Sequence, residues 1–252
     1  MKKIVCLRMI LVVLLLSFNI GAFANDDEPV INNDPYETFN RPMFIFNEWL
    51  DKLVLKPTAI LYTKIVPRPL AKGISNAYNN INTVPTIAND LLQFNFYQAI
   101  NDTWRLGINT TLGIGGLFDV ASWIGLEPNN TQDFGLTLAR WGWESSNYLV
   151  LPLFGPGTLR DQLAIWPNYY LTIYPLLKHD DALYYPIFFG SLVVMRADVL
   201  RYESMLQQAA FDKYTFVKNA YMQRRSYLIN RNKQLGNPYM DKNSILNLQQ
   251  EI

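Results

Sequence analysis

The chain has 252 residues, with 22 basic and 21 acidic side chains, one histidine and one cysteine. A chain of this length can bury a sizeable core and is most simply one domain or one extended assembly of helices. Because the charges nearly balance, there is no basic excess to replace counterions on nucleic-acid phosphates. The composition therefore excludes a nucleic-acid binder that works by charge.

The first 24 residues have the pattern of a secretory signal peptide. A positively charged start precedes the apolar run Met9–Phe18, and small residues at Ala22 and Ala24 predict cleavage after Ala24. The alternative is a retained anchor, but a spanning helix needs about 20 apolar residues. Cleavage removes three of the 22 basic residues and leaves 19 against 21 acidic, a net charge of −2. Residues 25–33 are then expected to form a polar, mobile leader.

The single cysteine and the single histidine exclude several kinds of site. Cys6 lies in the expected signal peptide, which leaves no disulfide, thiolate ligand, thiol nucleophile or lipidated cysteine. His179 is the only base available to a serine triad, and no G-x-S-x-G motif accompanies it. Ser122 and Ser191 have no base nearby in the sequence. We therefore predict no catalytic residue, no metal site and no cofactor.

Aromatic residues make up 14% of the chain and charged residues only 17%, against about 25% charged residues in ordinary soluble domains. Tyrosine and tryptophan favour sites with one apolar and one wet end, such as membrane interfaces. A large aromatic core would explain the same composition, so composition alone does not choose between the two.

The first helix is expected to start with Asp34 as its N-cap and Pro35 as its first helical residue. Its apolar stripe at helical spacing consists of Phe39, Met43, Phe46, Leu50 and Leu53. Other large apolar residues, such as Phe44 and Trp49, fall off that stripe. The helix is therefore either deeply buried or in contact with lipid.

Prolines are expected to divide the next part into short pieces; they are Pro57, Pro67, Pro69 and Pro85. The apolar stripes of two of these pieces are Leu70, Ile74, Ala77, Tyr78 and Ile81, then Phe96, Ile100, Trp104 and Ile108. Helical periodicity favours core positions for such stripes. The apolar, glycine-rich stretch Thr111–Leu126 is short for a span but long enough for a helix lying in or dipping into an interface.

The rest of the chain lacks the apolar stripes at helical spacing that mark the earlier pieces, until about Ala197. Tyr148–Phe154 is a continuous apolar run that predicts a short extended piece, and Thr158 is expected to cap the next helix. The uncharged run Tyr184–Met195 has 12 residues, too few to span, which predicts a core helix or a re-entrant piece. Ala197–Leu235 predicts one solvated helix with a single packed face, and 236–252 a loose tail.

Several long blocks resemble the MlaA (VacJ) family. They are Asp34–Asn47 (DPYETFNRPMFIFN), Val54–Asn76, Asn109–Leu126 followed by Asp133–Gly142, and Tyr148–Asp161. Because the blocks follow one another in the same order, the chain is similar to this family over 34–235, which we interpret as one MlaA/VacJ-like helical domain.

The resemblance implies a mostly α fold: a ring-like assembly of short amphipathic and interfacial helices with one short extended or hairpin segment. It implies a transport protein on the periplasmic side of the outer membrane, without enzymatic activity. Such a protein removes mislocalised phospholipid from the outer leaflet through an amphipathic channel and so maintains lipid asymmetry. The implied partners are phospholipid, a trimeric porin and a periplasmic lipid carrier. The alternatives are a structural envelope protein without a channel, or a lipid-acting esterase.

The candidate lipid-binding residues are Phe39, Asn40, Arg41, Met43, Phe46, Asn47, Phe134, Trp141 and Trp143. Arg41 and Arg68 match the geometry of a phosphate headgroup, with a structural ion pair as the alternative. Asn40 and Asn47 are expected to cap backbone groups or line a polar surface. Arg160, next to Asp161, favours helix-end electrostatics over a substrate contact.

Two features depart from the family pattern. Family members typically carry a lipidated cysteine after the signal peptide, and the leader 25–33 has none. Relatives also have a more glycine-rich hairpin near the channel, whereas Gly142 is the only glycine in Arg140–Asn147. We therefore expect this segment to be stiffer than its glycine-rich counterparts.

Overall fold

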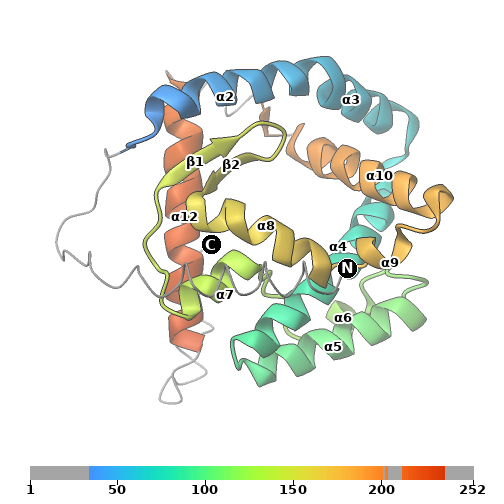
Figure 1. Ribbon diagram of the computed structural model, residues 1–252. Helices are drawn as coiled ribbons and strands as arrows, with labels where there is room; N and C mark the ends of the chain where they lie inside the picture. The colour runs from blue at the N-terminus through green and yellow to red at the C-terminus, as the bar shows by residue number, and fades with distance from the viewer. Residues whose placement is uncertain (1–33, 201, 204–211, 236–252) are drawn as a thin grey trace. The chain divides into compact units, whose positions relative to one another are not determined.

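The computed structural model describes residues 34–200, 202–203 and 212–235. The expected signal peptide, the leader and the tail 236–252 lie outside these ranges. The unit that begins at Asp34 consists mostly of helices, with one two-stranded antiparallel sheet among its described residues (Figure 1). This confirms the predicted mostly α fold class with one short hairpin.

The elements follow in chain order. They are α2 (Glu37–Leu50), the π-helix η1 (Asp51–Leu55), α3 (Lys56–Ile65), α4 (Arg68–Leu92), α5 (Phe96–Thr111), α6 (Val120–Trp123), α7 (Phe134–Arg140), β1 (Tyr148–Leu151), β2 (Gly155–Thr158), α8 (Leu159–Leu171), α9 (Tyr174–Leu177), α10 (Asp181–Leu200) and α12 (Lys213–Leu235).

The first helix begins later than predicted. Tyr36 has non-helical φ and ψ of −109° and 16°, so α2 starts at Glu37 and lacks a side-chain cap. Asp34 instead accepts a hydrogen bond from the Tyr36 N–H at 3.2 Å within the preceding turn. The expected N-cap role of Asp34 is therefore wrong.

Two of the four prolines do not divide the chain as predicted. Helix α2 continues through η1 into α3, because a wider π turn lies just before Pro57 and relieves the clash of its ring with the preceding turn. Pro85 lies inside the 25-residue helix α4. The break at Pro67 and Pro69 is confirmed, since Pro67 is the N-cap of α4.

Contacts between the described elements close into a circuit. Helix α3 packs on α10, α10 on α4, α4 on α7 and α8, α8 on β1, and β1 on α2. Helix α5 lies along α4, and α12 packs against α7 and β2 (Figure 1). The chain therefore surrounds its interior with helices drawn from distant parts of the sequence.

The hairpin β1–β2 pairs Tyr148 with Thr158 and Leu151 with Gly155, which confirms the predicted extended piece over Tyr148–Leu151, whereas 152–154 form the turn. Thr158 also caps α8 as predicted, because its hydroxyl accepts a hydrogen bond from the Asp161 N–H. Tyr148 and Val150 of the hairpin pack with Phe44 and Tyr214 in a small, mostly aromatic cluster. This cluster joins α2, β1 and α12.

The predicted apolar stripes do not form the core. On α2, Phe39 and Phe46 are exposed, while Asn40 and Phe44 are buried. On α5, the stripe residues Phe96, Ile100 and Trp104 are exposed. The buried positions of α5 are instead Gln98, Ala99, Asn101, Asp102, Arg105 and Asn109. The spacing was helical, but the polar face points inward.

Three further predictions change. The run Tyr184–Met195 lies within the 20-residue helix α10, which is long and apolar enough to cross a membrane, and only 17% of its most apolar window is buried. Thr111–Leu126 contains turns and the short helix α6, since Ile114, Gly115 and Gly116 all have positive φ. Ala197–Leu235 contains the end of α10 and the separate helix α12, with 201 and 204–211 outside the described residues.

Candidate functional site

The described residues have an inverted distribution of polarity. Twenty-one buried side chains are polar or charged, against twelve buried hydrophobic ones, of which six are alanines. Thirty-five large hydrophobic side chains are exposed. Soluble proteins bury charged groups rarely and expose only limited apolar patches. This distribution therefore suits an apolar surrounding and a hydrated interior.

Asp90 of α4 and Asp102 of α5 are the most buried acidic groups of this interior, with no exposed surface. Asp90 accepts a hydrogen bond from Asn95 at 3.3 Å, and Asp102 accepts one from Gln98 at 3.0 Å. The second oxygen of each carboxyl has no hydrogen-bond partner among the described residues. Burial, reinforced by the charge of Asp102, raises the pKa of Asp90 to about 7, and burial raises the pKa of Asp102 to about 6.

Two cavities of about 280 and 360 Å³ are present in the unit, and the smaller one lies between α7 and α12. The larger one lies between α4, α5 and the loop around α6. There Arg105 binds both oxygens of Asp119, at 2.9 and 3.1 Å. Burial alone would raise the pKa of Asp119. Hydrogen bonds from Ser122 and Asn109 and the charge of Arg105 nevertheless hold this pKa below its ordinary value.

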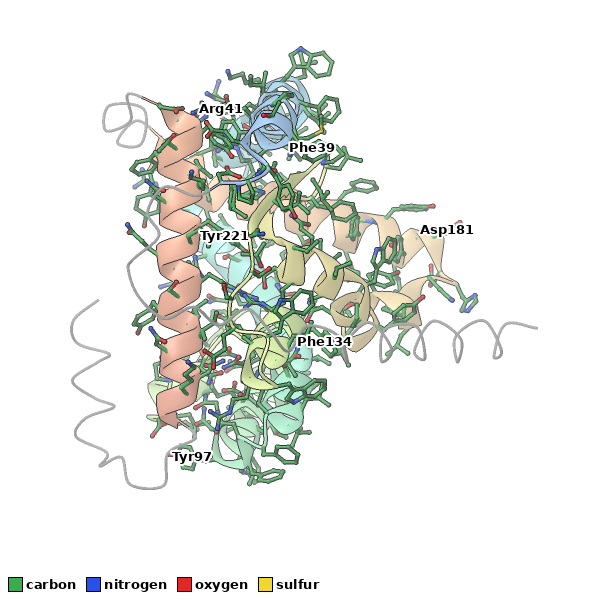
Figure 2. All side chains as sticks on the ribbon, turned by 60° about the vertical axis from the view of Figure 1, so that its left-hand side comes forward. Phe39, Arg41, Tyr97, Phe134, Asp181 and Tyr221 are labelled. Carbon is green, nitrogen blue, oxygen red and sulfur yellow. The ribbon has the colours of Figure 1, made fainter. Side chains whose placement is uncertain are left out.

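A third cavity, of about 230 Å³, lies between α7, β2, α8 and α12 and has mixed polarity. On its polar side Arg225 binds Asp133 and Asp161, each at 2.6 Å. On its apolar side stand Phe134 and Phe154. Figure 2 shows Phe134 and, from α12, Tyr221, which donates a hydrogen bond to Asp161 at 2.7 Å.

This charged cluster is built to stay ionised. Arg160 is 1% exposed and binds Asp161 at 3.0 Å as well as the carbonyls of Trp143 and Glu144. Burial alone would raise the pKa of Asp161, but the charges of Arg225 and Arg160 hold this pKa below its ordinary value. The cavity thus presents fixed charge beside aromatic surface, an arrangement that suits an amphipathic ligand.

Comparison with known proteins then gives the family. The family model described as MlaA lipoprotein matches residues 32–228. The chain belongs to the MlaA family.

Relatives of this MlaA-family chain carry related names. It is 32% identical over 218 residues to the intermembrane phospholipid transport system lipoprotein MlaA of Escherichia coli, covering 84% of each chain. An uncharacterized protein of Rickettsia conorii is 36% identical over 208 residues, which cover 81% of this chain and 80% of the relative.

The fold agrees with the family. A solved structure reported as the structural basis for maintenance of bacterial outer membrane lipid asymmetry superposes with a TM-score of 0.66 and 32% identity. The match covers 79% of this chain and all of that one.

The MlaA-family structure commits two of the candidate lipid-binding residues to the backbone of the hairpin. Asn40 has no exposed surface; it donates to the carbonyl of Tyr148 at 3.1 Å and accepts from the N–H of Val150 at 2.9 Å. Asn47 donates to the carbonyl of Leu151 at 2.9 Å and accepts from the N–H of Leu153 at 2.8 Å. Both amides therefore hold α2 against β1. Capping backbone groups was one of the two roles expected for them from the sequence.

Arg41 is also occupied. It forms ion pairs with Glu37 at 2.6 Å and Asp212 at 2.7 Å, and its guanidinium lies 4.5 Å from the centre of the Tyr214 ring. The hydrogen bonds that Arg41 donates to Asp212 and Glu37 raise its pKa above the ordinary arginine value. Arg41 therefore forms the structural ion pair that was expected from the sequence as the alternative to binding a phosphate headgroup.

The remaining candidates lie in separate places. Phe39 and Phe46 are exposed on α2, whereas Met43 packs against the aromatic cluster. Figure 2 labels Phe39. Phe134 and Trp141 pack edge to face at 6.0 Å, and the Trp141 ring N–H donates to the carbonyl of Leu92. Trp143 is half-buried and contributes its carbonyl to Arg160.

Sequence reasoning missed the buried polar face. Asp90, Asp102, Arg105 and Arg225 were not candidates, although a signal was present. On α5 the polar residues Gln98, Asn101, Asp102, Arg105 and Asn109 recur at helical spacing. Such a stripe, placed opposite an aromatic one, indicates a helix with its polar side toward the interior when the surroundings are apolar.

Proposed function

We propose that this protein transports phospholipid in the bacterial outer membrane, removing misplaced lipid from the outer leaflet and passing it toward a periplasmic carrier. Family membership and the names of its relatives in Escherichia coli and Haemophilus influenzae support phospholipid transport. The proposal rests on one observation above all: a polar interior enclosed by an apolar surface.

The physical reason follows from the two ends of a phospholipid. A headgroup crossing a bilayer needs hydrogen-bonding and charged partners along its path, because an unpaired polar group in an apolar medium costs several kcal/mol. The interior of this protein offers such partners around Asp133, Asp161 and Arg225. The exposed aromatic and aliphatic side chains leave the acyl chains in contact with apolar surface.

Attachment to the membrane is expected to come from the protein body. Each Å² of apolar surface moved into lipid contributes about 25 cal/mol, so a few hundred Å² contributes several kcal/mol. Exposed surface for this contact comes from Phe39 and Trp49 on α2, from Trp123 at the end of α6 and from α10. In this proposal a trimeric porin adds to the attachment, and no lipidated cysteine is needed.

The test is the amount of phospholipid in the outer leaflet of cells that lack the protein. Phospholipase added to intact cells, which reaches only the outer leaflet, should hydrolyse more phospholipid on such cells, and expression of the wild-type chain should reverse the increase. His179→Ala should also reverse it, since His179 is exposed. Hydrolysis that does not change on deletion would overturn the proposal.

A matched pair of variants tests whether the mixed cavity takes part. Phe154 and Leu163 are exposed to a similar extent, 54% and 56%, and only Phe154 lines the cavity. Phe154→Ser should therefore leave surface phospholipid raised, whereas Leu163→Ser should restore the wild-type level. Equal effects of the two variants would argue against this cavity as part of the route.

The alternative functions make different products. Mass spectrometry of lipids extracted from the purified protein should find intact phospholipid for a transporter. A lipid-acting esterase would release lysophospholipid and fatty acid, and a structural envelope protein would carry no lipid. Either of the last two results would replace the proposal.

A further inference from the structure

The largest of the three cavities is lined by polar side chains and one glycine. Its lining residues are Asn76, Asn79, Asn80, Asn82, Thr83, Thr86, Arg105, Asn109, Gly116, Asp119, Asn129 and Thr131. The volume of about 360 Å³ lies at the lower end of the range for small-molecule sites. Most such sites are largely apolar, so this lining restricts the ligand to a strongly hydrogen-bonding group.

The charges in this cavity are neutralised within its own wall. Arg105 binds both oxygens of Asp119 and also donates to the carbonyls of Leu126 and Glu127. Asp119 accepts a further hydrogen bond from Asn109 at 2.9 Å. A charged ligand group would gain little inside, whereas a neutral group with several hydroxyls could bind the remaining amides.

Amide groups remain free for such a ligand. The side chains of Asn79 and Asn82 make no hydrogen bond within the described part of the chain, and Asn80 uses only its N–H₂ group, on Thr110 at 2.9 Å. Each free amide both donates and accepts, as a hydroxyl does. Gly116, with φ of +90°, lets the loop approach Asn80 so closely that a Cβ would lie 2.6 Å from the Cβ of Asn80.

A cation stands on the same helix face. Lys72 precedes Asn76 by four residues on α4, so the two side chains are neighbours along the helix. Lys72 is exposed and forms no ion pair with any residue in the described ranges. An ammonium group at this position can bind a phosphate as a point charge.

We propose that this cavity binds the glycerol headgroup of a phosphatidylglycerol-type lipid, with the diol among the asparagine amides and the phosphate near Lys72. The inference rests on the proposed transport of phospholipid and adds a headgroup preference to it. Phosphatidylethanolamine carries an ammonium group, which the neutral wall does not balance.

The experiment measures binding of short-chain lipids to the full-length protein in detergent. Dihexanoyl phosphatidylglycerol should bind at least about tenfold more tightly than dihexanoyl phosphatidylethanolamine. The double variant Asn79→Leu, Asn82→Leu should abolish this preference and leave phosphatidylethanolamine binding unchanged. The exposed Asn230 of α12 provides the control, and Asn230→Leu should keep the preference.

Two further measurements identify the source of the headgroup and the role of the cation. Lys72→Gln should weaken binding of both lipids equally, because both carry a phosphate. Free sn-glycerol 1-phosphate, the soluble form of this headgroup, should not compete at the lipid concentration used. Equal competition would assign the cavity to a soluble ligand and overturn the lipid assignment. Equal binding of both lipids by the wild-type protein would overturn the headgroup preference alone. Failure to bind either lipid would instead count against the proposed transport.

Discussion

Replacing Asp90 by asparagine is expected to remove most of the pH dependence of stability between pH 5 and pH 8. The side chain is fully buried, and its pKa of about 7 lies above the ordinary value of 3.8 because of burial and the nearby charge of Asp102. Arg231 of α12 opposes the shift without cancelling it. The folded protein therefore holds a proton that the unfolded chain releases between about pH 4 and pH 7.

The sign and size of the effect follow from proton linkage. Stability is greatest below the unfolded-state pKa and is lost as the pH rises through the folded-state pKa. Each pKa unit corresponds to about 1.4 kcal/mol, so the titration of Asp90 lowers stability by about 2 to 3 kcal/mol between pH 5 and pH 8. In a protein of this size such a loss lowers the melting temperature by about 5 to 10 °C.

The assay is thermal unfolding in detergent at the two pH values. Asp90→Asn keeps the shape and a hydrogen-bond donor but cannot titrate, so its melting temperature should change much less between pH 5 and pH 8. Asp181→Asn, at the exposed start of α10, should behave like the wild type. A wild-type protein that is as stable at pH 8 as at pH 5, or more so, would refute the reasoning.

Further predictions concern single contacts. Arg225→Met should destabilise the protein by about 3 kcal/mol, because the buried Asp161 keeps only Arg160 as a cationic partner and Asp133 loses its ion pair. Lys233→Met, at an exposed ion pair, should cost less than about 1 kcal/mol in chemical denaturation. Asn40→Ala should cost about 2 to 4 kcal/mol by the same assay, since buried backbone groups of β1 lose their partner. Glu144→Gly should speed amide exchange of the segment from Trp141 to Asn147 through added backbone freedom; unchanged exchange would show that packing fixes it.

Element type was largely predictable because periodicity is local. The extended piece at Tyr148, the cap at Thr158 and the helix break at Pro67 all follow from residues within one turn. Pro85 was misread because α4 tolerates a proline once tertiary contacts hold both sides of it. The length of the helix that contains Tyr184–Met195 was underestimated, because flanking charged residues such as Arg196 still belong to the helix.

The direction of each helix face was not predictable from periodicity alone. The periodicity of apolar residues shows that a helix has an apolar and a polar face, but the surrounding solvent decides which face points inward. On α2 the buried Asn40 and Asn47 bond hairpin backbone more than 100 residues away, a contact that no local pattern contains. Helix α12 has a similar buried polar face: Lys218, Arg225 and Asn232 recur every seven residues and are all buried.

The inverted faces and the low charge content have one physical origin. If water were the solvent, the exposed apolar residues of α2, α5 and α10 would make this fold unstable or aggregation-prone. If lipid is the solvent, the same residues stabilise it, and the buried asparagines and ion pairs become necessary because the interior must be hydrated for a headgroup. The 17% of charged residues are then concentrated where they have partners, as at Arg160, Arg196 and Arg225. The amino-acid composition, the direction of the helix faces and the proposed lipid route are thus consequences of the same solvent.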